Sequence, residues 1–213
     1  MSYLLHVDSS SLHQDSVSRQ VAASFRAAWD GDVIHRDLAV DPVPHITAAG
    51  ITARETDPSQ HTTAQREALA LQDGLIAEYL GASAFLFTAP MYNLTMPSVL
   101  KAWLDQIIVV GRTARVPVSA GRPAVVISAR GGGYGPGAPN HGFDYVVPTL
   151  EAILGRQELL GLDVSTIIPE LTLAPVTAAM ESLLPLHEKS MVDAHRRARQ
   201  LARTITQTDG SAA

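Results

Sequence analysis

Short apolar runs alternate with amphipathic stretches along nearly the whole chain, and this alternation constrains the fold more than any other feature. The strand-like runs are residues 3–9, 32–38, 83–90, 122–129 and 163–173. Apolar residues at helical spacing occupy residues 16–29, 63–81, 97–110, 143–161 and 174–205. Central runs such as SAFLFTAP are continuously apolar, which is typical of parallel strands buried on both faces. The pattern predicts an α/β fold, a doubly wound sheet of five parallel strands with helices on both faces.

Length and composition indicate one globular domain. The chain has 213 residues and no dividing linker, so we expect a single domain over 1–206 and a disordered tail over 207–213. It has no cysteine, which excludes disulfides, thiolate metal sites and a cysteine nucleophile. The formal net charge of -5 argues against a nucleic-acid partner. No apolar run reaches the roughly 18 residues of a membrane span, so we expect a cytoplasmic protein without a membrane partner.

Ligands of doubly wound sheets bind outside the carboxyl ends of the strands, so the loops after the first, third and fourth strands are the candidates. The first loop, DSSSLHQDSVS, holds five serines and leads into a helix. Serine hydroxyls and the free N–H groups of a helix N-terminus can bind a phosphate. An equally good explanation is that Ser16 only caps the helix and the other residues form a turn.

The other two loops suit a flat ligand. PMYN, residues 90–93, separates a buried strand from a helix, and helix packing explains its prolines but not Tyr92 and Asn93. The loop ARGGGYGPGAPNHG, residues 129–142, either serves as a flexible connection or lets the backbone approach a ligand closely. A phosphate at one end and a planar ring at the other are the two ends of flavin mononucleotide (FMN), which therefore matches all three loops.

Three stretches, SSSLHQDSVS, PMYNLTMPSVLKAWLDQI and ARGGGY, give the chain a resemblance to the FMN-dependent NADH-azoreductases, a branch of the flavodoxin-like quinone reductases. The resemblance implies a flavodoxin-like sheet of strand order 2-1-3-4-5 and a homodimer with FMN at the subunit interface. The residues that it assigns to the cofactor are Ser10, Ser16, Val17 and Ser18 at the phosphate and ribityl end, Met91, Tyr92, Asn93 and Leu94 at the ring, and Ala129, Arg130, Gly131 and Gly132 at the pyrimidine side.

The chain departs from that family in two places. Leu94 follows the PMYN motif, where the family has an aromatic residue. The segment 111–123 is shorter than in the family and has Ala114 where a phenylalanine is expected. We therefore expect an open acceptor site with Arg112 and Arg115 near its mouth, which favours quinones, particularly acidic or bulky ones, over azo dyes.

The reaction implied by the resemblance passes two electrons from NADH or NADPH to a quinone or azo acceptor by a ping-pong mechanism. No side chain is then needed as an acid or base, and Asn93 and His141 are only weak candidates for a catalytic role. A flavodoxin-like electron carrier and a biosynthetic-pathway reductase with a different acceptor are the alternatives. Neither G-x-S-x-G nor H-E-x-x-H is present, which argues against a serine hydrolase and a metalloenzyme, so we expect no metal.

Overall fold

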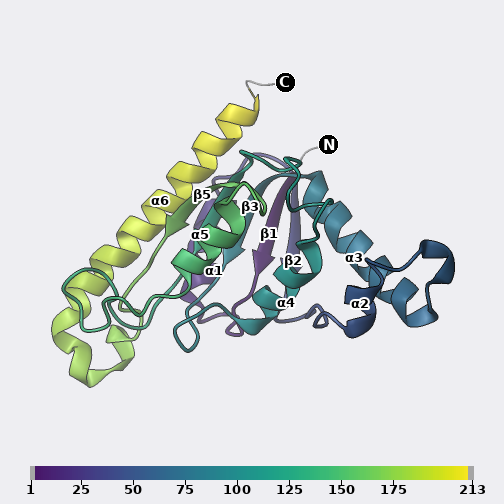
Figure 1. Ribbon diagram of the computed structural model, residues 1–213. Coiled ribbons are helices and arrows are strands. Elements are labelled where there is room, and N and C mark those ends of the chain that lie inside the picture. The colour runs from purple at the N-terminus through teal and green to yellow at the C-terminus, as the bar shows by residue number, and fades with distance from the viewer. Residues whose placement is uncertain (1–2, 211–213) are drawn as a thin grey trace.

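A sheet of five parallel strands lies at the centre of the molecule (Figure 1). The computed structural model describes residues 3–210. The strands are β1 (Tyr3–Asp8), β2 (Val33–Asp37), β3 (Ala82–Thr88), β4 (Pro123–Ile127) and β5 (Asp163–Ile167). Their spatial order is β2-β1-β3-β4-β5, and every neighbouring pair is parallel. The predicted doubly wound, flavodoxin-like sheet is confirmed.

Helices cover both faces of this sheet. The α-helices are α1 (Val17–Arg26), α2 (Ala48–Thr52), α3 (Thr63–Gly81), α4 (Ser98–Ile107), α5 (Val147–Gly155) and α6 (Leu184–Gly210), and the 3₁₀ helices are η1 (Pro58–Gln60), η2 (Ala174–Val176) and η3 (Ala178–Leu183). Helices α3, α4 and α5 pack on one face, with Tyr79 and Trp103 in that core. Helices α1 and α6 pack on the other face, with Phe25 and Leu201 in theirs. Burial on both faces explains the continuous apolar runs of the central strands.

Polar side chains fix the starts of two helices that the sequence predicts. At α3, Thr62 Oγ1 accepts the Gln65 N–H at 3.3 Å, and Gln65 Oε1 accepts the Thr62 N–H at 2.9 Å. This reciprocal pair is a capping box, and it satisfies two N–H groups that the helix itself leaves unpaired. At α1 the N-cap is Ser16, as the sequence predicts. The serine loop therefore enters its helix with a fixed geometry.

Two elements of the second half are shorter than the sequence indicates. The expected strand 163–173 ends at Ile167, and Pro169 follows soon after. Proline has no N–H to donate to a sheet ladder, so the strand does not continue through it. The expected helix 143–161 is only Val147–Gly155, and Pro148 lies in its first turn. Beyond the helix the chain turns back, and Leu162 N–H donates to Leu154 O at 2.8 Å.

The last part of the chain also differs from the expected single helix over 174–205. It begins with the short helices η2 and η3, and α6 starts only at Leu184. Pro185 therefore lies in the first turn of α6, where a missing N–H breaks no helical bond, instead of kinking the helix. Helix α6 continues to Gly210, so the first residues of the expected tail 207–213 are helical, and 211–213 lie outside the described residues.

The topology brings the three candidate loops to one edge. In a parallel sheet every strand ends at the same side, so the loops after β1, β3 and β4 all leave from the carboxyl edge. Helix α4 then runs back across the sheet, which brings residues 119–122 to the amino edge, where Arg122 Nη1 donates to Ala82 O at 2.7 Å. Among residues 3–210, the structure has no helix with the length and apolar character of a membrane span.

Candidate functional site

The serine loop, residues 9–16, connects β1 to α1 at the carboxyl edge. Ser16 caps α1 by accepting the Arg19 N–H at 3.4 Å. Its hydroxyl also donates to Ser10 Oγ at 2.8 Å and lies 3.2 Å from Ser18 Oγ. The side chains of Ser10, Ser16 and Ser18 are buried. The structure therefore brings the three predicted serines together as one hydroxyl cluster at the N-terminus of a helix.

Backbone donors complete this cluster. The N–H groups of Val17 and Ser18 open the first turn of α1, and neither has an acceptor among the hydrogen bonds of residues 3–210. A helix N-terminus also carries a partial positive charge, which favours an anion. Hydroxyl and N–H donors together suit the oxygens of a phosphate monoester. The structure thus gives the predicted phosphate loop the required donor chemistry.

The predicted ring segment is a tight turn. Tyr92 N–H donates to Thr95 O at 2.9 Å, and Thr95 N–H donates to Tyr92 O at 3.1 Å. The two central residues have positive φ, 49° for Asn93 and 70° for Leu94, as in a type I′ turn. Asparagine tolerates this conformation, whereas leucine is strained in it. Both side chains are exposed at the tip of the turn, which leaves them free to contact a ligand.

Hydrogen bonds connect this turn to both of the other loops. Ser11 N–H donates to Tyr92 Oη at 3.0 Å, and Ser10 Oγ lies 3.4 Å from the same oxygen. On the other side, Met91 N–H donates to Ala129 O at 2.9 Å. The three segments that the sequence selects are therefore neighbours in space. Tyr92 lies between the hydroxyl cluster and the glycine strip, the name we give to residues 129–133.

Two glycines of this strip allow close packing within the chain itself. A Cβ atom on Gly131 would lie 2.7 Å from Leu173 Cδ1, and one on Gly132 would lie 2.9 Å from Asn140 Nδ2. Both distances are too short for a real side chain. In both cases the contacted atom is the end of a side chain that can move aside, so packing alone does not require glycine at these positions.

The contacts of the Arg130 side chain argue against a direct role in ligand binding. It is buried, pairs with Asp144 and lies 3.7 Å from Glu170 Oε1. Its guanidinium also stacks over the Tyr134 ring, 5.7 Å from the ring centre. Its backbone N–H donates to Pro169 O at 2.9 Å. The structure therefore places Arg130 as a support that ties the glycine strip to the chain after β5.

The remaining predicted side chains lie farther out or elsewhere. The His141 side chain is exposed, and its backbone N–H donates to Ala138 O at 3.0 Å. Ala114 is buried, and Arg115 N–H donates to Glu158 O at 3.2 Å, beyond the end of α5. Helix α5 runs from the carboxyl edge towards the amino edge of the sheet. The expectation that Arg115 lines the mouth of the site is therefore wrong within one subunit.

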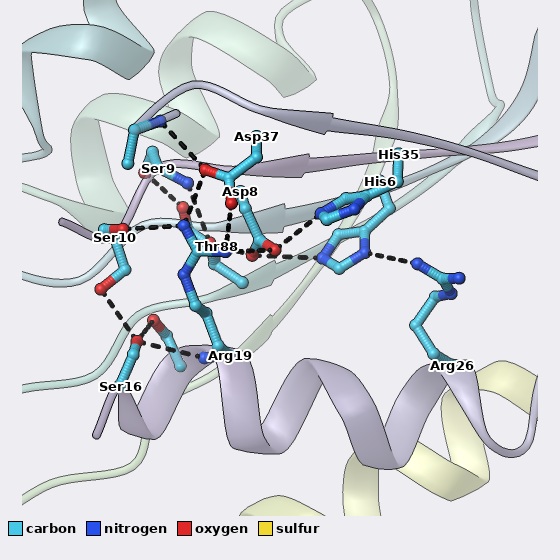
Figure 2. Close-up of polar contacts among 12 residues, drawn as sticks. His6, Asp8, Ser9, Ser10, Ser16, Arg19, Arg26, His35, Asp37 and Thr88 are labelled. Atoms are coloured by element: carbon cyan, nitrogen blue, oxygen red, sulfur yellow. Dashed lines mark hydrogen bonds and ion pairs between the residues drawn. The ribbon is translucent and has the colours of Figure 1, made fainter. Parts of the chain in front are cut away.

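A polar network that the sequence analysis does not predict lies beside the serine loop (Figure 2). Asp8, the last residue of β1, accepts hydrogen bonds from Thr88 Oγ1 at 2.7 Å and from Arg19 Nη1 at 3.0 Å. The same Arg19 binds Asp37 at the end of β2. His35 Nε2 lies 2.8 Å from Asp8 Oδ2. The only sequence signal for this network is the charged residue that ends each strand.

Hydrogen bonds keep the buried carboxylate of this network charged. Burial alone would raise the pKa of Asp8. Hydrogen bonds from His6, Thr88 and His35 more than offset burial, so the pKa of this carboxyl lies well below its ordinary value. Asp8 is therefore an anion throughout the physiological pH range, and it directly precedes the serine loop.

His6, Asp8 and His35 also have the composition of a metal site, since their ligand atoms all lie within 4.8 Å of one another. The contact of His6 with Arg26 argues against that role. Arg26 Nη1 lies 3.1 Å from His6 Nδ1, and a guanidinium can only donate, so Nδ1 must accept. His6 Nε2 then carries the proton and faces Asp8 Oδ1 at 3.3 Å. A protonated nitrogen cannot ligate a metal, so these residues form a hydrogen-bonded network.

Comparison with known proteins identifies the family. The family model described as "Flavodoxin-like fold" matches residues 2–171. An FMN-dependent NADH:quinone oxidoreductase of Streptomyces coelicolor is 48% identical over 214 residues, which cover 97% of this chain and 96% of that protein. The chain belongs to the FMN-dependent NADH:quinone oxidoreductase family. A family member of the same name from Streptomyces avermitilis is 47% identical and covers 96% of this chain.

Solved structures show the same fold for this oxidoreductase. An azoreductase from Bacillus anthracis str. Sterne superposes with a TM-score of 0.79 at 21% identity, over 96% of this chain and all of that one. A structure described as an FMN-dependent NADH-azoreductase from Bacillus anthracis str. Ames Ancestor in complex with FMN gives a TM-score of 0.76 at 19% identity, over 95% of this chain and 100% of that chain. These neighbours and the family membership confirm the resemblance that the sequence suggests.

A cavity of about 530 Å³ in the oxidoreductase lies away from the predicted site. Its walls include Arg122, Asp163 and Ile205, from the starts of β4 and β5 and from α6. The strands begin at the amino edge, so this cavity is at the opposite side of the sheet from the serine loop. The arrangement of donors at the carboxyl edge, and not the size of a hollow, therefore carries the site assignment.

Proposed function

We propose that the protein is an FMN-dependent oxidoreductase that passes two electrons from NADH or NADPH to a quinone or azo acceptor. The names of relatives with up to 48% identity support the activity. The junction at Tyr92 supports the location of the site, because the Tyr92 hydroxyl bonds the serine loop while the backbone of the same segment bonds the glycine strip. A ligand with a phosphate at one end and a ring at the other would span these two connected regions.

The residues present fit this cofactor. The phosphate end would be held by the hydroxyls of Ser10, Ser16 and Ser18 and by the free N–H groups of Val17 and Ser18. These donors bear no charge, so the cradle binds through hydrogen bonds and the helix dipole. When bound, FMN supplies the two-electron chemistry of the reaction.

The flavin ring would lie against the turn formed by Met91, Tyr92, Asn93 and Leu94. Exposed Asn93 offers an amide at the tip of this turn, and Leu94 offers an apolar side chain for ring contact. The pyrimidine side would meet the backbone of Ala129, Gly131 and Gly132, where the small side chains allow close approach.

We further propose a homodimer in which FMN lies at the subunit interface and the two substrates react in turn by a ping-pong mechanism. Exposed apolar side chains gather in the loops near the carboxyl edge and support such an interface. They are Leu94, Phe143, Tyr145, Leu173 and Val176. Covering them would remove apolar surface from water, which favours association.

Three measurements on the purified protein test the function. Its absorption spectrum and the flavin released by heating identify the cofactor, which we expect to be FMN. Anaerobic addition of NADH should bleach the flavin absorbance, and a quinone should restore it. Recovery of FAD, or no flavin even after incubation with FMN, would overturn the cofactor assignment. Flavin that both NADH and NADPH leave oxidised would favour the electron carrier, and bleaching that neither a quinone nor an azo dye reverses would favour a reductase with a different acceptor.

A further inference from the structure

Arg19 holds the polar network together from the first turn of α1 (Figure 2). Its side chain turns back towards the carboxyl ends of β1 and β2. Nη1 donates to Asp8 Oδ2 at 3.0 Å and to Asp37 Oδ2 at 2.7 Å. Nη2 donates to Asp37 Oδ1 at 2.8 Å and to the backbone carbonyl of Ser10 at 2.8 Å. One guanidinium therefore joins two strands, a helix and the serine loop.

The register of the sheet explains why an arginine is needed there. Asp8 on β1 and Asp37 on β2 are paired residues of neighbouring strands. Like charges directly opposite each other on a sheet repel, and Arg19 lies between these two carboxylates. The Arg19 hydrogen bonds outweigh burial and lower the pKa of Asp37, so both acids face the arginine as anions.

This environment leaves Arg19 little capacity to bind a phosphate directly. Both terminal nitrogens are engaged, and two carboxylates surround its single positive charge. Arginines that bind phosphate use a free pair of N–H groups in a fork. Nε has no partner among residues 3–210, but it is a single buried donor. The two terminal nitrogens, which form the fork, are therefore saturated by the chain itself.

We propose that Arg19 is a positioning residue for the phosphate end of FMN, acting through the Ser10 carbonyl and not through contact with the phosphate. This inference rests on the proposed function. Three anchors fix the start of the loop: the Ser10 carbonyl on Arg19, the Ser10 hydroxyl near Ser16, and the Ser11 N–H on Tyr92. The following residues, 11–15, are exposed. Without the Arg19 anchor the Ser10 peptide can rotate, and the hydroxyl cluster loses its fixed geometry.

The Arg19→Lys substitution separates positioning from charge. Lysine keeps the positive charge but lacks the planar fork that holds Asp37 and Ser10 at the same time. Positioning predicts that the Kd for FMN rises by about tenfold, the loss expected for a charge-assisted hydrogen bond. The Kd for riboflavin, which has no phosphate, should stay within about twofold. An effect of the positive charge alone predicts instead that Arg19→Lys keeps its FMN affinity.

The Asp37→Asn substitution gives a test of sign. It removes a negative charge near the phosphate site, so electrostatics alone predicts tighter FMN binding. It also weakens the paired hydrogen bonds that Asp37 accepts from Arg19 Nη1 and Nη2. A positioning role for Arg19 therefore predicts weaker FMN binding and unchanged riboflavin binding. Tighter binding by Asp37→Asn would overturn the inference.

Arg36→Lys is the matched control. Arg36 lies on β2, one residue before Asp37, and forms a two-pronged pair with Glu78 through bonds of 2.7 and 2.8 Å. Its replacement disrupts a similar half-buried ion pair away from the serine loop. We expect Arg36→Lys to lower the unfolding midpoint while the ratio of the FMN and riboflavin Kd values stays at the wild-type value.

The experiment measures both flavins by fluorescence titration of the flavin-free protein. A selective loss of FMN affinity in Arg19→Lys and Asp37→Asn supports the inference. Equal losses for FMN and riboflavin would show a merely structural role and overturn it. Wild-type affinity for FMN in Arg19→Lys would also overturn it while leaving the proposed function intact. A wild-type protein that binds neither flavin would overturn the proposed function together with the inference.

Discussion

Leu94 occupies a backbone conformation that its side chain disfavours, in the turn that we assign to the flavin ring. Its φ of 70° lies in the left-handed region, and its side chain is 39% exposed. The carbonyl of Leu94 accepts Tyr145 N–H at 3.1 Å, which helps to hold the residue in place. Strain of this kind persists where the surrounding structure fixes the backbone and is common at functional sites.

Replacing Leu94 with glycine should relieve this strain. The left-handed conformation costs a residue with a side chain roughly 1–2 kcal/mol. Glycine avoids that cost but loses roughly 0.5–1 kcal/mol more in backbone entropy. We therefore expect Leu94→Gly to raise the free energy of unfolding of the flavin-free protein by up to about 1 kcal/mol. Urea unfolding measures it, and Leu12→Gly is the control, since Leu12 is an exposed leucine without positive φ. A lower free energy of unfolding for Leu94→Gly than for the wild type would contradict the proposed strain at Leu94.

His6 is the second residue whose surroundings fix its chemistry. Burial lowers the pKa of His6, and the facing arginine favours the neutral ring too. Below pH of about 6.5 the unfolded chain protonates this histidine while the folded chain does not. The unfolded state then binds more protons, so stability falls as the pH falls from about 6.5 towards the folded pKa.

The His6→Gln substitution should remove this part of the pH dependence. A glutamine amide can donate to Asp8 and accept from Arg26, as the neutral ring does. The wild-type free energy of unfolding should decrease by up to about 1.4 kcal/mol per pH unit within the window, and the variant should show a shallower slope. Denaturant titrations between pH 4.5 and 7, with exposed His45→Gln as the control, provide the measurement. Equal slopes for wild type and His6→Gln would exclude the buried neutral histidine.

At the scale of elements, local signals are reliable where they are complete within a short stretch. Helix α3 coincides with the predicted 63–81, and a capping box of Thr62 and Gln65 fixes its start. The end of β5 and the late start of α6 are wrong in the prediction, since apolar spacing continues past Pro169 and Pro185 and hides the breaks.

The candidate site also has parts that the sequence predicts and a part that it does not. Serines, the PMYN turn and the glycine strip are visible as sequence motifs, and the structure brings them together. The network around Arg19 could not be predicted, because it depends on the register that places Asp8 opposite Asp37. Strands β1 and β2 are parallel and are joined through a helix, so no short turn in the sequence fixes their register.

Asp144 connects the start of α5 to the glycine strip, and we expect it to be important for stability. Its Oδ1 accepts the N–H groups of Val146 at 3.0 Å and Val147 at 3.3 Å at the start of α5, while Oδ2 pairs with buried Arg130. In Asp144→Ala the buried Arg130 guanidinium keeps only Glu170 as a carboxylate partner. We therefore expect the free energy of unfolding to fall by about 3 kcal/mol or more. Asp144→Asn keeps the helix acceptor and should lose less.

The control for this prediction is an exposed ion pair. Arg156 and Glu158 have side chains that are 65% and 69% exposed, so Glu158→Ala should change stability by less than about 1 kcal/mol. Chemical denaturation of the three variants and the wild type gives the comparison. If Asp144→Ala were as mild as Glu158→Ala, the Arg130 pair would contribute little to the glycine strip.

At the scale of the whole molecule, the two edges of the sheet have different roles. The carboxyl edge carries the serine loop, the Tyr92 turn and the glycine strip, all connected by hydrogen bonds. The amino edge carries the 530 Å³ cavity and contacts within the chain, such as Ser119 Oγ with Leu160 O at 2.8 Å and Tyr79 Oη with Ser119 Oγ at 2.7 Å. Segment 111–123, which in the resembled family brings an aromatic lid, approaches this second edge.

This separation gives Arg115 a diagnostic value for the assembly. If segment 111–123 of either subunit stays away from the FMN at the proposed interface, Arg115→Ala should leave kcat/KM for an anionic naphthoquinone within about twofold of wild type, because an exposed charge at another part of the surface is screened over roughly 8–10 Å. Without an aromatic lid, a neutral azo dye should be turned over several-fold less efficiently than a small neutral quinone, since a lost stacking partner removes about 1 kcal/mol. Arg112→Ala is the matched control, because Arg112 is already paired with Asp73 at 2.6 Å. A several-fold loss confined to Arg115→Ala and the anionic quinone would contradict this prediction, and would mean that segment 111–123 of one subunit reaches the flavin of the other.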